Sequence, residues 1–169
     1  MEIRFDAYNH SAKIMIKIDL LKNHPDAIPE LAHIWHDVLG RIWFPEITIQ
    51  EIESLTYDEL NRQPETTSFV ALYDEIPVGF CTFKLKEEFR PDLGPWLADV
   101  VVNPKYQKQG IGKMLVDVAV RQAKECGFKK LYLFAFDPTI PAYYKRLGWR
   151  QICMAEFQSH PVTLMEVWL

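Results

Sequence analysis

The chain has 169 residues, and its 19 lysines and arginines against 23 aspartates and glutamates give a net charge of −4. A composition of 49% hydrophobic and 25% charged residues is that of an ordinary globular domain, which excludes a disordered or disulfide-dense chain. We therefore expect one domain over residues 1–169, with residues 1–11 as an N-terminal extension of unassigned role.

Neither hydropathy nor cysteine content points to a membrane or to export. The longest apolar run, 131–136, is far shorter than the roughly 20 residues that a membrane helix needs, and the N-terminus lacks the apolar core of a signal peptide. The three cysteines are scattered and odd in number, which is typical of a reducing compartment. We expect a cytoplasmic protein that does not bind a membrane.

Charge is distributed unevenly along the chain. Residues 103–130 carry seven basic and two acidic side chains, a local +5, so the remaining residues carry −9. The acidic total argues against nucleic-acid binding. The basic segment indicates instead one anionic ligand, bound at one place.

Alternating apolar residues predict strands, and apolar residues three and four apart predict helices. In chain order the sequence predicts a strand at 13–20, helices at 25–39 and from 49, a hairpin of strands 67–73 and 78–85, a strand at 96–102, a helix from 111, a strand at 130–136, a short helix with Tyr143 and Tyr144, and strands at 150–157 and 162–168.

Local signals fix several helix ends. Thr48 and Glu51 have the spacing of a capping box at the start of the second helix. Gly40, Gly127 and Gly148 each follow a predicted helix and are expected to end it. The strand at 130–136 is apolar on both faces, so residues 96–136 predict a βαβ unit with parallel strands.

A polar loop with two glycines joins the strand of this unit to its helix. Backbone N–H groups at a helix start attract anions, and glycine lets a phosphate approach without a Cβ in the way. A Walker A loop would require glycine in place of Gln107 and serine or threonine in place of Met114. A dinucleotide fingerprint would require a third glycine in place of Leu115, so both motifs fail.

Two segments resemble the motifs of the GCN5-related N-acetyltransferase (GNAT) superfamily. Residues 107–112, Gln-Lys-Gln-Gly-Ile-Gly, are similar to its Arg/Gln-x-x-Gly-x-Gly/Ala signature. Residues 137–149 resemble its second segment, Asn-x-x-Ala-x-x-Phe-Tyr-x-x-x-Gly-Phe, with Asp137, Ile140 and Tyr143 in place of the usual Asn, Ala and Phe. Either segment alone is a weak signal, but the two together around a βαβ unit are a strong one.

The resemblance implies the α/β fold of acyl-CoA N-acyltransferases: a mixed, mostly antiparallel sheet of six to seven strands, with a parallel βαβ core and helices on both faces. It also implies direct transfer of acetyl from acetyl-CoA to a primary amine of a small molecule or peptide, in a ternary complex. Pairing of two copies into a homodimer is compatible with the resemblance. His33 and His36 have metal-ligand spacing but no clear third ligand nearby, so we expect no metal.

Two side chains are candidates for the proton transfers of this reaction. An amine must lose a proton before it attacks, and Asp99 is the one acidic side chain in the strand 96–102, which makes it the candidate base. Tyr144 matches the family position that protonates the leaving thiolate. The alternatives are a structural or solvated carboxylate for Asp99 and a core tyrosine for Tyr144.

The resemblance places coenzyme binding on this strand, the glycine loop and the second segment. The backbone N–H of Val102 would stabilise the carbonyl oxygen as it becomes anionic, and Val100 and Val102 would pair with the pantetheine arm as an added strand would. The predicted coenzyme-binding residues are Val100, Val102, Gln107, Lys108, Gln109, Gly110, Ile111, Gly112, Lys113, Asp137 and Tyr144.

The resemblance also places the acceptor pocket between the first two helices and the last hairpin. In this chain that region contains Trp35, His36, Trp43 and Phe44, with Gln158 and His160, and the predicted acceptor-binding residues are Trp35, His36, Phe44 and His160. Residues 22–65 carry a net charge of −6, which favours a cationic amine, although an ordinary solvated helix surface has the same composition.

Three functions therefore remain open. The first is an acetyl-CoA-dependent N-acetyltransferase, and the second is an acyltransferase that uses a longer acyl-CoA. The third is a non-catalytic acyl-CoA-binding sensor or interaction module. The presence of both Asp99 and Tyr144 favours catalysis, because a sensor needs neither.

Overall fold

A computed structural model describes the backbone of residues 3–9 and 12–169 and the side chains from residue 15 onward. The described residues form one sheet of eight strands in the order β1-β2-β3-β4-β5-β6-β8-β7. Only β5 and β6 are parallel neighbours in it. The strands are β1 (Ile3–Asn9), β2 (Ala12–Leu20), β3 (Thr66–Tyr73), β4 (Ile76–Lys84), β5 (Trp96–Val102), β6 (Lys130–Ala135), β7 (Arg150–Phe157) and β8 (His160–Trp168).

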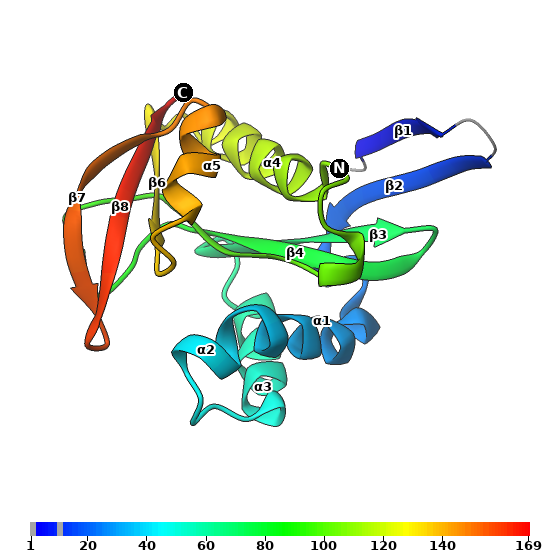
Figure 1. Cartoon of the computed structure of the whole chain (residues 1–169), viewed down its shortest axis with the longest axis horizontal. Helices are drawn as coiled ribbons and strands as arrows, with labels where there is room; N and C mark the ends of the chain where they lie inside the picture. Colours follow the sequence, from blue (N-terminus) through cyan, green and yellow to red (C-terminus); the bar gives the residue numbers. More distant parts are fainter. Residues whose placement is uncertain (1–2, 10–11) are drawn as a thin grey trace.

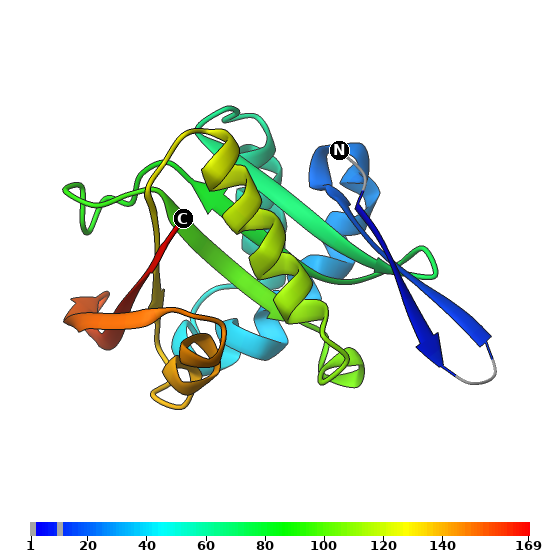
Figure 2. The ribbon, with the colours of Figure 1, turned by 90° about the horizontal axis from the view of Figure 1, so that it is seen from above.

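Helices cover both faces of this sheet. α4 and α5 lie on one face and α1 to α3 on the other (Figure 1), and α4 runs across the sheet (Figure 2). The helices are α1 (Ile28–Trp35), α2 (Arg41–Trp43), α3 (Ile49–Leu60), α4 (Ile111–Glu125) and α5 (Ile140–Arg146), with helical turns η1 (Leu21–Asn23), η2 (Pro25–Ala27), η3 (His36–Gly40) and η4 (Pro104–Tyr106). None of the helices in the described part of the chain has both the length and the hydropathy of a membrane span.

The predicted α/β class is confirmed, and the N-terminal segment adds a strand to it. Residues 3–9, predicted only as an extension, form β1 and pair antiparallel with β2. Residues 1–2 and 10–11 of the same segment lie outside the described residues. The predicted capping box is present, since the Thr48 side chain accepts from the N–H of Glu51 and the Glu51 side chain accepts from that of Thr48.

The prediction that Gly40 ends the first helix is wrong. The π-helical turn η3 carries α1 on into α2, and Gly40 has a right-handed helical φ of −57°. A Cβ on Gly40 would lie 3.0 Å from Cζ3 of Trp35. Glycine is therefore needed here because the Trp35 ring lies too close for a Cβ. By contrast, Gly127 and Gly148 follow α4 and α5 with φ of +84° and +93°, as predicted.

The turn of the last hairpin lies before His160, whereas the sequence predicts that His160 is within it. Gln158 and Ser159 form the turn, with φ of +46° and +66°, and His160 begins β8. Asp74 and Glu75 join β3 to β4 with φ of +46° and +69°. Two successive positive φ angles suit the twist of a tight hairpin.

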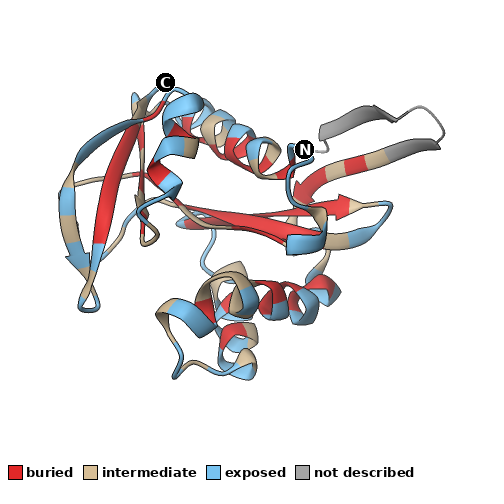
Figure 3. Cartoon of the chain, in the orientation of Figure 1, coloured by how far each residue is buried: buried red, intermediate tan, exposed pale blue. Residues whose placement is uncertain are grey.

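Buried side chains gather on both faces of the sheet and along its central strands (Figure 3). On one face, Leu115 and Ala119 of α4 pack with the largest cluster. On the other, Ile28 and Leu31 of α1 pack with Phe80 of β4. Each face thus has its own apolar cluster, so β4 and β5 are held between two packed layers.

The contact between β5 and β6 is very short. One residue pair, Trp96 with Tyr132, joins them, and the N–H of Tyr132 donates to the carbonyl of Pro95 at 3.0 Å. Trp96 is fully buried, with its ring among those of Phe89, Tyr132 and Phe134. Beyond this pair the two strands diverge, and the edge of β5 that faces β6 has no partner strand in the described part of the chain.

The close contact between β4 and β5 predicts the effect of one substitution. In Gly79→Ala the new Cβ would lie 2.5 Å from the carbonyl oxygen of Val101, so the two backbones must separate. We expect the free energy of unfolding to fall by about 1–3 kcal/mol, measured by urea denaturation.

Gly112→Ala is the matched control. Its Cβ would meet only the Tyr143 hydroxyl at 3.3 Å and a methyl group of Val102 at 3.9 Å. Because alanine favours a helix over glycine by about 1 kcal/mol, this variant should be as stable as the parent or more stable. Equal losses in both variants would contradict the assigned role of Gly79.

Candidate active site

A cavity of about 1050 Å³ opens where β5 and β6 diverge. One wall comes from α1, α2 and α3, and another from the loop before α4, from α5 and from β6. β5 runs between these walls. The cavity thus has room for two molecules side by side, one against each wall, with β5 as the floor between them.

One end of the cavity is the loop that leads into α4. Gly110 precedes the helix with φ of +84°, and among the described residues no side chain caps the first helical turn. A Cβ at Gly110 would have no atom within 4 Å, so space is open above the loop. The Gln107 side chain donates to the carbonyl of Val102 at 3.0 Å and ties the loop to β5. The uncapped N–H groups of this turn suit an anion.

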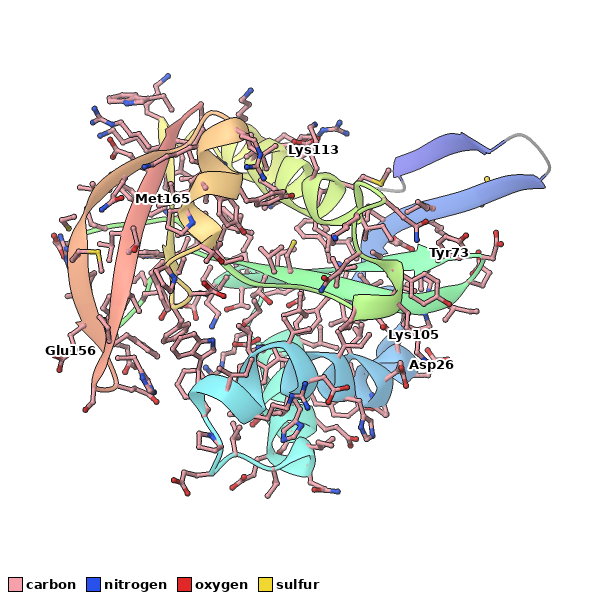
Figure 4. The ribbon with its side chains drawn as sticks, in the orientation of Figure 1. Asp26, Tyr73, Lys105, Lys113, Glu156 and Met165 are labelled. Atoms are coloured by element: carbon pink, nitrogen blue, oxygen red, sulfur yellow. The ribbon has the colours of Figure 1, made fainter. Side chains whose placement is uncertain are left out.

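Basic side chains surround the loop. Figure 4 labels Lys105 on the turn before the loop and Lys113 in the first turn of α4. Lys108 and Lys113 line the cavity. Lys113 Nζ lies 2.7 Å from an oxygen of Asp117, and this hydrogen bond raises the pKa of Lys113. Arg146 of α5 adds a cation that the sequence analysis did not assign.

Ten of the eleven predicted coenzyme-binding residues line the cavity, and Gln109 does not. Asp137 is used locally as well, because its Oδ1 accepts from the N–H of Thr139 at 2.8 Å and from its hydroxyl at 2.7 Å. These two bonds lower the pKa of Asp137. Its carboxylate therefore shapes the turn that leads into α5.

Tyr144 lies on α5 at the border of the cavity and the core. It is 6% exposed, and its ring meets that of Trp149 edge to face at 5.6 Å. In the described part of the chain the Tyr144 hydroxyl has no hydrogen-bond partner. Every fully buried side-chain polar atom there does have a partner, so the hydroxyl is not fully buried and opens on the cavity. Burial raises the pKa of Tyr144, which keeps the phenol protonated.

A bulge in β5 turns Asp99 out of the regular strand. The β4–β5 register shifts so that Asp99 and Val100 lie opposite Cys81 alone, and Asp99 has φ of +55°. Leu97 and Val102, five residues apart, would face opposite sides of a regular strand, yet both pack on the α4 side. The Asp99 side chain lines the cavity, and its Oδ1 accepts from the indole N–H of Trp35 at 3.0 Å.

Three further charged side chains share the cavity with Asp99. Lys84 Nζ lies 3.0 Å from a carboxylate oxygen of Glu59 and 3.6 Å from one of Glu87. Burial raises the pKa of both glutamates and the charge of Asp99 raises it further, against the opposing effect of Lys84. Three carboxylates thus face one ammonium group, and this end of the cavity favours a cation.

Sequence reasoning missed this group of charges. Glu59 lies in the last turn of α3, Lys84 ends β4 and Glu87 lies in the following loop, so no local motif joins them. The only signal in the sequence is the acidic excess of residues 22–65, which includes Glu59.

The predicted acceptor residues fall into two sets. Trp35 and Phe44 line the cavity, with their rings stacked at 5.9 Å. His160 stands behind this wall, with its ring edge-on to those of Phe44 and Phe136 at 6.0 Å. His36 is half-buried beside Asp37 and does not line the cavity. Trp43, Phe136 and Phe157 extend the aromatic wall.

The repulsion among the carboxylates predicts a gain in stability when Asp99 loses its charge. Asp99→Asn removes two repulsions and one attraction, and it keeps a side-chain oxygen that can accept from the indole N–H of Trp35. Asparagine also tolerates a positive φ. We expect the free energy of unfolding at pH 7 to rise by about 0.5–1 kcal/mol, measured by urea denaturation.

This gain should depend on pH in a defined direction. Because the pKa values of Glu59 and Glu87 are raised, these groups bind protons earlier than ordinary glutamates as the pH falls, which relieves the repulsion in the parent protein. The advantage of Asp99→Asn should therefore shrink between pH 7 and pH 4. A variant that is less stable at pH 7 would contradict this account.

Comparison with known proteins places the sequence of the chain in a family. The acetyltransferase (GNAT) family model matches residues 30–149. An uncharacterized N-acetyltransferase (ycf52-like) of Prochlorococcus marinus is 39% identical over 51 residues, which make up 30% of this chain and 28% of that protein. The match thus spans little more than a quarter of the relative's length.

Solved structures share the fold over almost the whole chain. Ribosomal-protein-alanine N-acetyltransferase of Brucella melitensis superposes with a TM-score of 0.72 and 16% sequence identity. The match covers 90% of this chain and 99% of the Brucella chain. PaiA N-acetyltransferase of Thermoplasma acidophilum, solved with coenzyme A, has a TM-score of 0.66 and 16% identity, covering 91% and 99%. At these identities the likeness concerns the fold alone. The family model spans more than half of the chain and includes both the glycine loop and Tyr144, and the chain belongs to the acetyltransferase (GNAT) family.

Proposed function

We propose that this protein transfers the acetyl group of acetyl-CoA to a primary amine, with both substrates bound together. The observation that carries the proposal is the meeting, in one cavity, of an uncapped helix start, an unpaired strand edge, a carboxylate and a protonated phenol. These are the four things that the transfer requires: an anion site, a site for an extended amide arm, a base and an acid.

The coenzyme half of the cavity suits acetyl-CoA. Its pyrophosphate would accept from the N–H groups at the start of α4, beside Lys108 and Lys113. The amide groups of the pantetheine arm would pair with the free edge of β5 at Val100 and Val102. A solved protein of the same fold holds coenzyme A, which supports this choice of cosubstrate.

The acceptor half suits a cationic amine of a small molecule or peptide. The rings of Trp35 and Phe44 offer an apolar and π-rich wall, and the surplus of carboxylates around Lys84 attracts an ammonium group. Residues of α1 to α3 form most of this half, so the acceptor would enter from the side opposite α4.

The transfer can be written with these groups. The ammonium loses a proton to Asp99, directly or through water, and the amine nitrogen then attacks the acetyl carbonyl carbon. The carbonyl oxygen becomes anionic and accepts from the N–H of Val102. The C–S bond then breaks and the sulfur takes the proton of the Tyr144 hydroxyl. The attacking nitrogen gives up its second proton, which restores the phenol through water, and Asp99 releases its proton to solvent as N-acetylamine and free coenzyme A leave. Homodimer formation and a cytoplasmic location stay predictions.

The first test is ligand-dependent stability and turnover. Acetyl-CoA and coenzyme A at a hundred times their dissociation constant should each raise the free energy of unfolding by about 2.7 kcal/mol, and NADH should not. Thiol release from acetyl-CoA should then depend on an added amine: 2-phenylethylamine, 1,5-diaminopentane or a lysine-containing tripeptide.

The same assay separates the alternatives. A faster rate with propionyl-CoA or succinyl-CoA would assign a longer acyl donor. Stabilisation by acetyl-CoA without turnover of any amine would favour a sensor. No stabilisation by either coenzyme A form would overturn the proposal.

Tyr144→Phe tests the acid. Without the phenol the thiolate must leave unprotonated, so kcat should fall about a hundredfold or more. The unfolding free energy of the ligand-free protein should not change, because the hydroxyl has no protein partner in the described part of the chain. Since burial raises the pKa of Tyr144, the parent enzyme should not lose activity through this group below pH 10. An unchanged kcat would rule out the assigned role.

A further inference from the structure

We propose that Trp35 is a positioning residue that holds the Asp99 carboxylate for its reaction with the amine, an inference that rests on the function proposed above. The indole N–H of Trp35 donates to Oδ1 of Asp99 at 3.0 Å. This bond links the last residue of α1 to the bulge of β5, across 64 positions of the sequence.

The bond makes the two oxygens of the carboxylate unequal. Oδ1 is occupied by Trp35, whereas Oδ2 has no hydrogen-bond partner in the described part of the chain and opens on the cavity. An indole N–H can only donate, so Trp35 cannot take the proton of the amine itself. Oδ2 is thereby left as the acceptor for that proton.

The position of Asp99 makes such a restraint necessary. Its φ of +55° is uncommon for an aspartate and places the side chain away from the regular pleat. Lys84 lines the same cavity and already contacts two carboxylates. An Asp99 side chain that turned to pair with Lys84 would be lost as a base. Trp35 holds it away, since no ion pair joins Asp99 and Lys84 in the residues that the structure describes.

The donor is itself well fixed. The Trp35 ring stacks on Phe44 with centroids 5.9 Å apart and planes 20° from parallel. Behind it, the helix continues through the π-helical turn, and Gly40 leaves the room that the ring occupies. The same ring therefore forms the acceptor wall with its face and orients the base with its edge.

A double-mutant cycle tests the proposal. Trp35→Phe keeps an aromatic ring but removes the N–H, and we expect kcat to fall about tenfold or more with the fastest of the three amines named above, while KM for acetyl-CoA stays the same. In the Asp99→Asn background, Trp35→Phe should cause no further loss of kcat, because its effect passes through the carboxylate.

Trp43→Phe is the matched control. Trp43 lines the same wall and stacks on Phe136, but its indole N–H has no hydrogen-bond partner in the described part of the chain. This variant should change KM for the amine far more than kcat. Equal losses of kcat in Trp35→Phe and Trp43→Phe, or additive losses in the double variant, would overturn the proposal.

Nuclear magnetic resonance tests the hydrogen bond without any acceptor. The chain has five tryptophans, and Trp35→Phe identifies the indole N–H signal of Trp35. In Asp99→Asn this signal should move upfield, because the acceptor loses its charge, while the other indole signals stay in place. A Trp35 signal that ignores Asp99→Asn would overturn the proposal, whatever the enzyme assay gives. Failure of the acetyl-CoA stabilisation would instead count against the proposed function and leave this signal unaffected.

Discussion

The site depends on the very short pairing between the parallel strands β5 and β6. The two parallel strands meet at one residue pair and then separate, so the central sheet opens in its middle instead of closing over a core. What keeps the halves together is the aromatic cluster around Trp96, in which Phe89 meets both Phe134 and Phe157 edge to face. Aromatic pairs bury much area in a fixed geometry, so they can replace the missing ladder of hydrogen bonds.

The opening also concentrates features that cost stability. A non-glycine residue at positive φ costs about 1–2 kcal/mol, and the carboxylates around Lys84 repel one another. The apolar clusters on the two faces of β4 and β5 offset these costs, since Val101 and Val102 are nearly inaccessible on opposite sides of the strand. Packing of the apolar core thus holds the bulge in place, and the Asp99 carboxylate on the bulge does not have to stabilise the fold.

Much of the fold and of the cavity wall around the glycine loop could be predicted from the sequence, because each rests on short-range patterns. The alternation of residues, the Thr48 capping box and the glycine loop all act within a few residues. Tyr144 sits in a segment with its own motif. The mixed sheet and the use of both its faces followed from the family resemblance that these patterns carry.

The charged group at the other end of the cavity could not be predicted in the same way. Glu59, Lys84 and Glu87 meet only in three dimensions, and the bulge at Asp99 leaves no mark in a run of apolar residues that suits a regular strand. Gly40 was misassigned because glycine serves two purposes, positive φ and close approach, and the sequence does not say which.

The unpaired edge of β5 has a consequence for the protein without its ligand. Free strand edges invite pairing with strands of other molecules, and many proteins block them with charges or prolines. Here the edge is recessed between α5 and the helices of the opposite face, where a whole sheet cannot reach it but a single extended chain can. The walls of the cleft thus oppose pairing with another sheet, and the same geometry suits an extended chain.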